Sequence, residues 1–250
     1  MKSLLDVPQK GQQALGVYVG DAGVVVAEIA ASVGFDYMRI DNEHTLNNPS
    51  TLTELIRVAN AADVPTLVRV AGTEEITKIL DCGATGIMIP GLETVEQAQE
   101  GVNLCKYAPL GERGMARASR ALGYGLMDAD EYFATANKKI AFCAQIESKK
   151  GVENIDAIAA LEGVDIVTTG PWDLAQSLGV TGKVDHPDVL AAQDHVIKMT
   201  LKHKKIVMLN ASTPEAAAKV KEKGVLMATI CVDAPFIARA MKAHIGKFRT

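Results

Sequence analysis

The sequence of 250 residues has few cysteines, and their spacing suggests no pairing. Cys82, Cys105, Cys143 and Cys231 show no CxxC pattern, so we expect reduced, packed thiols rather than a disulfide framework or a cysteine-bound metal. The first residues lack the apolar core of a signal peptide, and no apolar run reaches the length of a membrane span. These absences predict a cytoplasmic protein with no membrane partner.

An excess of basic charge is also missing. Lysine and arginine number 26 against 30 acidic residues, the formal net charge is −4, and aromatic residues make up 4%. Because no basic patch is interleaved with aromatic residues, nucleic acid is not expected as a partner. Residues 231–235 contain no glycine-rich anion cradle, which disfavours a phosphorylated substrate. Small neutral or anionic ligands remain open.

What is present is one unit that repeats: a short apolar run, a turn and a segment with helical periodicity. The eight runs lie within residues 15–19, 35–44, 64–70, 86–90, 140–146, 164–168, 206–209 and 226–232. Runs that are apolar nearly throughout are typical of parallel strands covered on both sides. The length suits one barrel, so we predict a single-domain (β/α)8 TIM barrel over residues 1–250. A doubly wound open sheet is the alternative, although no GxGxxG follows the first run.

Local signals mark the ends of several helices. Asn48 followed by Pro49 predicts a capped helix start, and Thr73 is expected to cap the third helix, with acidic residues behind it. Gly34 and Gly83 are expected to end the first and third helices. Residues 109–126 have no convincing period and are interpreted as a long functional loop.

Polar residues gather where the predicted strands end. They are Asp41, Glu43 and His44 after the second strand, Arg69 after the third, Gln145 and Glu147 at the fifth, and Asp173 after the sixth. In a parallel barrel the segments that follow the strands face one open mouth. We therefore expect these side chains to converge there.

Glu147 and Asp173 are the clearest candidates for a shared site. Two carboxylates in one cavity repel each other unless a proton or a cation lies between them. Carboxylate and water ligands suit Mg²⁺ or Mn²⁺, and Co²⁺ can substitute. The alternative is structural: Glu147 pairs with Lys149 or Lys150, and Asp173 caps the helix that begins near Pro171.

The other polar residues at the strand ends also allow two interpretations. Arg69 either binds a substrate carboxylate or a developing enolate, or it forms a structural pair with Asp41. His44 is either a general base near neutral pH or a surface residue. Asp81 lies in the last turn of a predicted helix, where the helix dipole disfavours a negative charge. We therefore expect a cation or donor beside Asp81, from the same chain or across a subunit contact.

Four motifs in this order resemble those of one known family. They are Ile40-Asp41-Asn42-Glu43-His44, Leu67-Val68-Arg69, Gln145-Ile146-Glu147 and Gly170-Pro171-Trp172-Asp173-Leu174, with Gly111-Glu112-Arg113-Gly114 in the long loop. The sequence from about Leu15 to Ala240 is similar to the HpcH/HpaI aldolases, which are class II pyruvate aldolases. The family includes 4-hydroxy-2-oxoheptanedioate aldolase and 2-dehydro-3-deoxyglucarate aldolase.

This resemblance implies a divalent metal held by Glu147 and Asp173, with Mg²⁺ or Mn²⁺ expected and Co²⁺ or Zn²⁺ as further candidates. The metal would stabilise the enolate of a 2-oxo acid, and Arg69 would polarise the oxo group. His44 would move the proton of the C4 hydroxyl through a water molecule, with Asp81 paired to it.

The resemblance also assigns supporting residues. Asp41 and Glu43 would lie just behind the metal ligands, where Asp41 orders metal-bound water, and Gln145 would approach the substrate. Trp172 stands where the family usually has a small residue or asparagine, and Asn42 where glycine is common. Trp172 either narrows the substrate pocket or acts as a hydrophobic plug. Members are often hexamers, so a homo-oligomer is expected.

The function that these residues predict is reversible aldol cleavage of a 4-hydroxy-2-oxo acid to pyruvate, or a close 2-oxo acid, and an aldehyde. One alternative is a carbon–carbon lyase for malyl-CoA or citramalyl-CoA, although no cradle for the CoA diphosphate is evident. A second alternative is a non-catalytic protein that binds 2-oxo acids. The partners expected are therefore small molecules.

Overall fold

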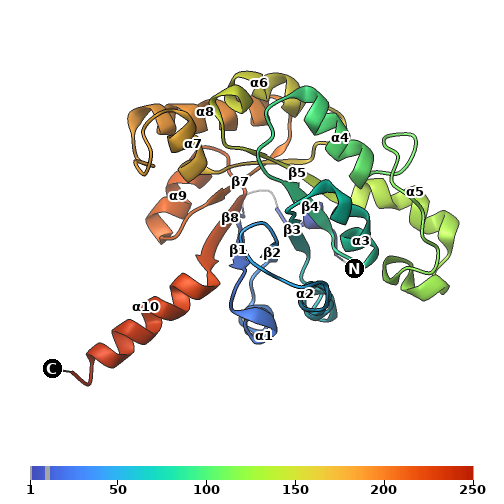
Figure 1. Cartoon of the computed structure of the whole chain (residues 1–250), viewed down its shortest axis with the longest axis horizontal. Coiled ribbons are helices and arrows are strands. Elements are labelled where there is room, and N and C mark those ends of the chain that lie inside the picture. Colours follow the sequence, from blue (N-terminus) through green and yellow to red (C-terminus); the bar gives the residue numbers. More distant parts are fainter. Residues whose placement is uncertain (1, 9–11, 250) are drawn as a thin grey trace.

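The computed structural model describes residues 2–8 and 12–249, and its centre is a closed barrel (Figure 1). All neighbouring strands are parallel and follow chain order, and the barrel closes where β8 pairs with β1. The strands are β1 Ala14–Val19, β2 Tyr37–Asp41, β3 Thr66–Arg69, β4 Gly86–Ile89, β5 Ala141–Ile146, β6 Ile166–Thr169, β7 Ile206–Asn210 and β8 Met227–Val232. The predicted (β/α)8 architecture is confirmed, and the open sheet is wrong.

Helices surround the barrel. They are α1 Gly23–Val33, α2 Pro49–Ala61, α3 Ile76–Asp81, α4 Val95–Cys105, α5 Ala129–Lys139, α6 Lys149–Ala160, α7 Pro171–Ser177, α8 Pro187–Lys202, α9 Pro214–Glu222 and α10 Asp233–Gly246, with 3₁₀ turns η1 Leu4–Asp6, η2 Thr73–Glu75 and η3 Arg120–Gly125. Across the described ranges, none of these helices has both the length and the apolar character needed to cross a membrane.

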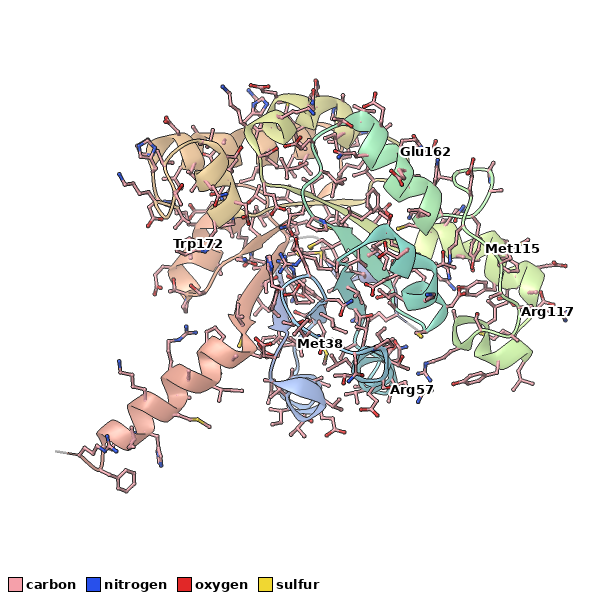
Figure 2. All side chains as sticks on the ribbon, in the orientation of Figure 1. Met38, Arg57, Met115, Arg117, Glu162 and Trp172 are labelled. Carbon is pink, nitrogen blue, oxygen red and sulfur yellow. The ribbon has the colours of Figure 1, made fainter. Side chains whose placement is uncertain are left out.

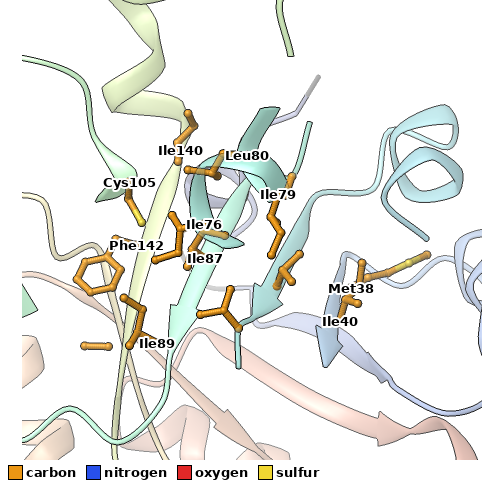
Figure 3. Packing of buried hydrophobic residues seen from close by; sticks show 14 of the residues in the cluster. Met38, Ile40, Ile76, Ile79, Leu80, Ile87, Ile89, Cys105, Ile140 and Phe142 are labelled. Carbon is orange, nitrogen blue, oxygen red and sulfur yellow. The ribbon is translucent and has the colours of Figure 1, made fainter. Parts of the chain in front are cut away.

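The strands are apolar throughout because one face of each packs against helices and the other against the barrel interior. Figure 3 shows the outer layer: Ile87 of β4 and Phe142 of β5 pack with Ile76 and Leu80 of α3 and with Cys105 of α4. All five side chains are almost completely buried. Burial of side chains of this size contributes about 1.5–3 kcal/mol each.

The barrel interior is closed at the amino-terminal ends of the strands. Tyr37, Leu67, Met88 and Met208 fill this end, and Leu4 of η1 packs beneath them. None of these five side chains is exposed. Polar chemistry inside the barrel is therefore confined to the opposite end, where the strands finish.

The helix signals in the sequence hold with one exception. The side chain of Asn48 accepts a hydrogen bond from the backbone N–H of Thr51 at 2.9 Å, and Pro49 is the first residue of α2. Gly34 adopts the left-handed conformation at the end of α1. The predicted threonine cap at Thr73 is wrong, because Thr73 already lies inside η2, its side chain makes no capping bond, and α3 begins only at Ile76.

The segment 109–126 is irregular as expected until η3, whose 3₁₀ turns the sequence pattern did not predict. Figure 2 shows Met115 and Arg117 of this segment at the edge of the molecule, far from Trp172. In the same orientation, α10 projects from the barrel and ends at the C-terminus (Figure 1). Arg113 of this segment pairs with Asp81 at the end of α3.

One close approach inside the barrel gives a test of the fold. A side chain at Gly16 of β1 would overlap the ring of Tyr37, which is fully buried and whose hydroxyl lies 3.1 Å from the hydroxyl of Thr229. Gly16→Ala is expected to lower the free energy of unfolding by about 1–3 kcal/mol because the core cannot expand freely. Urea denaturation measures this change.

Gly114→Ala is the matched control, since a side chain at Gly114 meets nothing within 4 Å. Equal stability of the two variants would contradict the packing described for β1 and β2.

Candidate active site at the mouth of the barrel

Four acidic side chains meet at the carboxyl ends of the strands, and we call them the mouth carboxylates. They are Asp41, Glu43, Glu147 and Asp173. Arg69 bridges the first two, because its guanidinium lies 2.8 Å from Asp41 and 3.0 Å from Glu43. Asp173 and Glu43 both act electrostatically on Glu147. The convergence predicted from the strand ends is therefore present within one chain.

Arg69 is held at every nitrogen of its guanidinium. Nε donates to Oδ1 of Asp41, Nη1 faces Oε2 of Glu43, and Nη2 donates to the hydroxyl of Tyr18. Burial alone would raise the pKa of Asp41, but the hydrogen bonds from Arg69 and Tyr18 outweigh it and hold that pKa below its ordinary value. The structural pair of Arg69 with Asp41, left open by the sequence, exists.

Glu147 is fixed by two donors. The backbone N–H of Gly91 donates to Oε1 at 2.8 Å, and the side-chain amide of Gln145 donates to Oε2. Burial raises the pKa of Glu147, and the nearby charges of Asp173 and Glu43 raise it further. Ionisation of Glu147 therefore carries a cost that a cation beside it would lower.

The start of α7 brings Asp173 to Glu147. Gly170 precedes the helix, Pro171 is its first residue, and Asp173 follows in the first turn. A side chain at Gly170 would overlap the carboxylate of Glu147, so only glycine permits this approach. Asp173 makes no capping bond to α7 in the described structure, and the alternative role as a helix cap is wrong.

The alternative lysine partners of Glu147 are not in contact with it. Lys150 instead lies 3.4 Å from Glu93. Within residues 2–8 and 12–249 Lys149 forms no ion pair. Glu147 therefore has neutral hydrogen-bond donors and acidic neighbours.

His44 lies at the rim with an exposed side chain. Its Nε2 is 3.7 Å from Oε2 of Glu43. Asp81 is not near it, because α3 ends at Asp81 shortly before β4 begins at the far end of the barrel. The cation expected beside Asp81 is Arg113 of the same chain, 2.7 Å away and completely buried. One chain does not bring His44 and Asp81 together.

Trp172 lies at the start of α7 beside Asp173, and Figure 2 shows it on that side of the molecule. It is 65% exposed. A hydrophobic plug would be buried, so Trp172 does not act as one within a single chain.

The sequence interpretation missed Arg39. This residue of β2 is 4% exposed, and it donates to Oε1 of Gln145 at 3.1 Å and to Oδ1 of Asn210 at 3.4 Å. Its guanidinium also lies 4.8 Å from the ring centre of Tyr18. Alternation along β2 places Arg39 and Asp41 on the same face, a signal that could have identified Arg39 from the sequence.

The donor set at the mouth fits a hard divalent cation. Glu147 and Asp173 offer carboxylate oxygens, which Mg²⁺ and Mn²⁺ prefer. Among the residues that the structure describes, no group of three or more histidine, cysteine, aspartate or glutamate side chains is arranged to hold a metal ion by itself. A cation there would therefore complete its shell with water or substrate oxygens, as Mg²⁺ commonly does.

A cavity of about 410 Å³ lies away from this site. Residues at the starts of β4 and β5 line it, together with Asn60, Arg120 and Tyr124. None of the mouth carboxylates reaches it. We place the candidate site at the mouth because the paired carboxylates and the arginine are found there, and cavity size alone does not identify chemistry.

The pKa of Asp41 gives a pH-dependent test. Because the folded-state pKa lies below the ordinary value of 3.8, the stabilisation by ionised Asp41 is complete above that value and is lost as pH falls through the folded-state pKa. Asp41→Asn should lower the free energy of unfolding at pH 7 by about 2–3 kcal/mol. The loss is no larger because Glu43 still neutralises Arg69 in the variant.

The difference between wild type and Asp41→Asn should stay constant from pH 7 to about pH 4 and shrink below it. Urea denaturation across this range measures the difference. If the difference in free energy of unfolding persisted unchanged in acid, the Asp41 charge would not be what stabilises the fold.

Comparison with known proteins identifies the family. Residues 14–240 match the family model of HpcH/HpaI aldolase/citrate lyase. Hydroxypyruvate/pyruvate aldolase of Roseobacter denitrificans is 36% identical, covering 93% of this chain and 88% of that protein. For 2-keto-3-deoxy-L-rhamnonate aldolase of Salmonella paratyphi B the identity is 33%, with 100% and 96% covered.

A solved structure agrees. The HpcH/HpaI aldolase from Desulfitobacterium hafniense superposes with a TM-score of 0.93 at 29% identity, covering 100% of this chain and 97% of that one. The match in sequence and the match in fold extend over nearly the same residues. The chain therefore belongs to the HpcH/HpaI aldolase/citrate lyase family.

Proposed function

We propose that this chain, a carbon–carbon lyase by family, reversibly cleaves a 4-hydroxy-2-oxo acid to pyruvate, or a close 2-oxo acid, and an aldehyde. The observation that supports this most directly is the approach of Glu147 and Asp173 beside a fully engaged Arg69. The names of the two similar aldolases, one for hydroxypyruvate and pyruvate and one for a 2-keto-3-deoxy acid, point to the same substrate class.

Glu147 and Asp173 would hold the divalent metal, with Mg²⁺ or Mn²⁺ as our expectation. When bound, such an ion supplies Lewis-acid stabilisation of the negative charge that develops on the 2-oxo acid. The two donors on Glu147 hold its carboxylate in place, one on each oxygen. The side-chain amide of Gln145 would in addition approach the substrate.

Arg69 would polarise the oxo group. Its three contacts hold it in one orientation in this structure, and preorganised donors of this kind lower reaction barriers. Asp41 maintains that orientation from a buried position. Glu43 lies between Arg69 and the metal-binding pair and would order water with Asp41.

His44 would move the proton of the C4 hydroxyl. Its exposed ring at the rim allows contact with substrate through water, and a histidine is suited to proton transfer near neutral pH. Asp81 could assist His44 only from another subunit, because within one chain it is bound to Arg113 at 2.7 Å. Trp172 beside Asp173 would contact the aldehyde part of the substrate.

We further propose that the protein is a cytoplasmic homo-oligomer, a hexamer by its resemblance to the family. Two apolar faces support association of copies. Val25, Ile29 and Val33 are more than half exposed and recur every fourth residue along α1, and α10 exposes Met241 and Ile245. A second copy would cover these faces.

The CoA-ester lyase is not favoured, since the similar proteins named above act on oxo acids by name and no CoA diphosphate cradle was evident in the sequence. A non-catalytic binder would keep pyruvate binding without cleavage. A panel of hydroxy-oxo acids, assayed for pyruvate release with lactate dehydrogenase, separates the binder from the aldolase.

Metal dependence tests the proposed function. Glu147→Gln and Asp173→Asn should each lower kcat about a thousandfold, because several kcal/mol of charge stabilisation are lost with the metal. A chelator should abolish pyruvate release, and Mg²⁺ or Mn²⁺ should restore it. Asp156→Asn is the control, since Asp156 pairs with Lys202 on the surface. Full activity after metal removal would disprove the proposal.

Association through α10 is a separate prediction. The double variant Met241→Asp and Ile245→Asp should sediment as a smaller species than wild type, because charges at these positions oppose burial against another copy. Lys242→Asp changes charge on the same helix without touching the apolar residues and should leave the assembly intact. A monomeric wild type in sedimentation would refute this prediction.

A further inference from the structure

Arg39 differs from Arg69 although both guanidinium groups face the same end of the barrel. Arg69 contacts two carboxylates. Arg39 forms no ion pair with any acidic residue that the structure describes, and its Nε has no hydrogen-bond partner there. The positive charge of Arg69 is therefore neutralised by the protein, and that of Arg39 is not.

The neutral contacts of Arg39 offset only part of the cost of its burial. The amide oxygen of Gln145 lies 3.1 Å away, that of Asn210 3.4 Å away, and the Tyr18 ring centre 4.8 Å away. A buried charge without a counter-ion is strongly unfavourable. A residue that is costly for stability at a functional site is commonly one that function requires.

The contacts of Arg39 link it to the carboxyl ends of two other strands, β5 and β7. Asn210, its longer and weaker contact, is exposed at the end of β7. Gln145, its other contact, also donates to Glu147. An anion that replaced Asn210 would meet Arg39 from the open side while remaining near the mouth carboxylates.

The charges at the mouth point the same way. The four mouth carboxylates and the two arginines leave two formal negative charges when all are ionised, which one divalent cation would balance. Removal of the Arg39 charge would leave the metal-bound site with a net negative charge, which would repel an anionic substrate.

We propose that Arg39 is a substrate-binding residue. Its guanidinium binds the carboxylate of the 2-oxo acid, on the inner side of the mouth carboxylates. This inference rests on the proposed function, which supplies the substrate class. If Arg39 were solely structural, it would hold Gln145 in place, and Gln145 would in turn support the proposed metal ligand Glu147. The two roles predict different effects on anion and cation binding.

Calorimetry with pyruvate, in the presence of Mg²⁺, tests the inference on the full-length protein. Arg39→Met and Arg39→Gln should raise the Kd for pyruvate about 10- to 100-fold, the worth of one charge-assisted hydrogen bond. Arg39→Lys should recover part of the affinity. Arg57→Met is the matched control. Arg57 lies on α2 (Figure 2) and acts on the hydroxyl of Tyr124, which lines the separate cavity, so its loss should leave the Kd unchanged.

Mn²⁺ binding to the metal-free variants, followed by electron paramagnetic resonance, provides the second measurement. The Kd for Mn²⁺ in Arg39→Met should equal or fall below that of wild type, because a positive charge near the cation has been removed. The thermal midpoint should not fall, because an uncompensated buried charge is replaced by an apolar side chain. Arg39→Gln serves where Arg39→Met does not fold.

Each outcome decides the inference. Pyruvate affinity within about twofold of wild type in both neutral variants overturns it, and so does a joint loss of pyruvate and Mn²⁺ binding, which identifies a structural role. Wild type that binds no pyruvate overturns the inference and the proposed function together. Pyruvate binding that depends on Arg39, without cleavage of any hydroxy-oxo acid, supports the inference and refutes the aldolase.

Discussion

The approach of Glu147 to Asp173 is the interaction on which the proposed chemistry depends. Their carboxylates come from successive strand ends, β5 and the start of α7 after β6, and a side chain at residue 170 would overlap the carboxylate of Glu147. Within the part of the chain that the structure describes, no lysine contacts this pair to relieve the repulsion between the two charges. The fold therefore keeps a destabilising pair at its open end, where a cation and a substrate can enter, and closes the other end with apolar side chains.

Much of this arrangement could be predicted from the sequence because it follows from parallel topology. Eight apolar runs separated by helical segments leave few folds to consider, and in a barrel every strand end reaches the same rim. The convergence of Asp41, Arg69, Glu147 and Asp173 needs no more than this. Helix starts such as Asn48 were also predictable, since capping is a local interaction between neighbouring residues.

The features that could not be predicted depend on a local tightening of the chain or on contacts between distant segments. Thr73 failed as a cap because the chain tightens into η2, which sequence alone does not reveal. The cation beside Asp81 was expected, but its identity as Arg113 depends on how the segment after α4 folds back. Arg39 was overlooked because its partners, Gln145 and Asn210, are more than a hundred residues away in sequence.

The two arginines illustrate how one barrel separates orientation from recognition. A guanidinium bound to two carboxylates is rigid, so Arg69 can hold a fixed position. Its charge, however, is largely neutralised by the protein itself. A guanidinium with only neutral neighbours is less stable in the barrel and retains its charge for a ligand. If Arg69 alone served the substrate, neutralisation by Asp41 and Glu43 would weaken the attraction that brings an anion to an acidic mouth. Arg39 supplies the attraction that Arg69 lacks, because its positive charge is not neutralised by the mouth carboxylates and lies on the inner side of them.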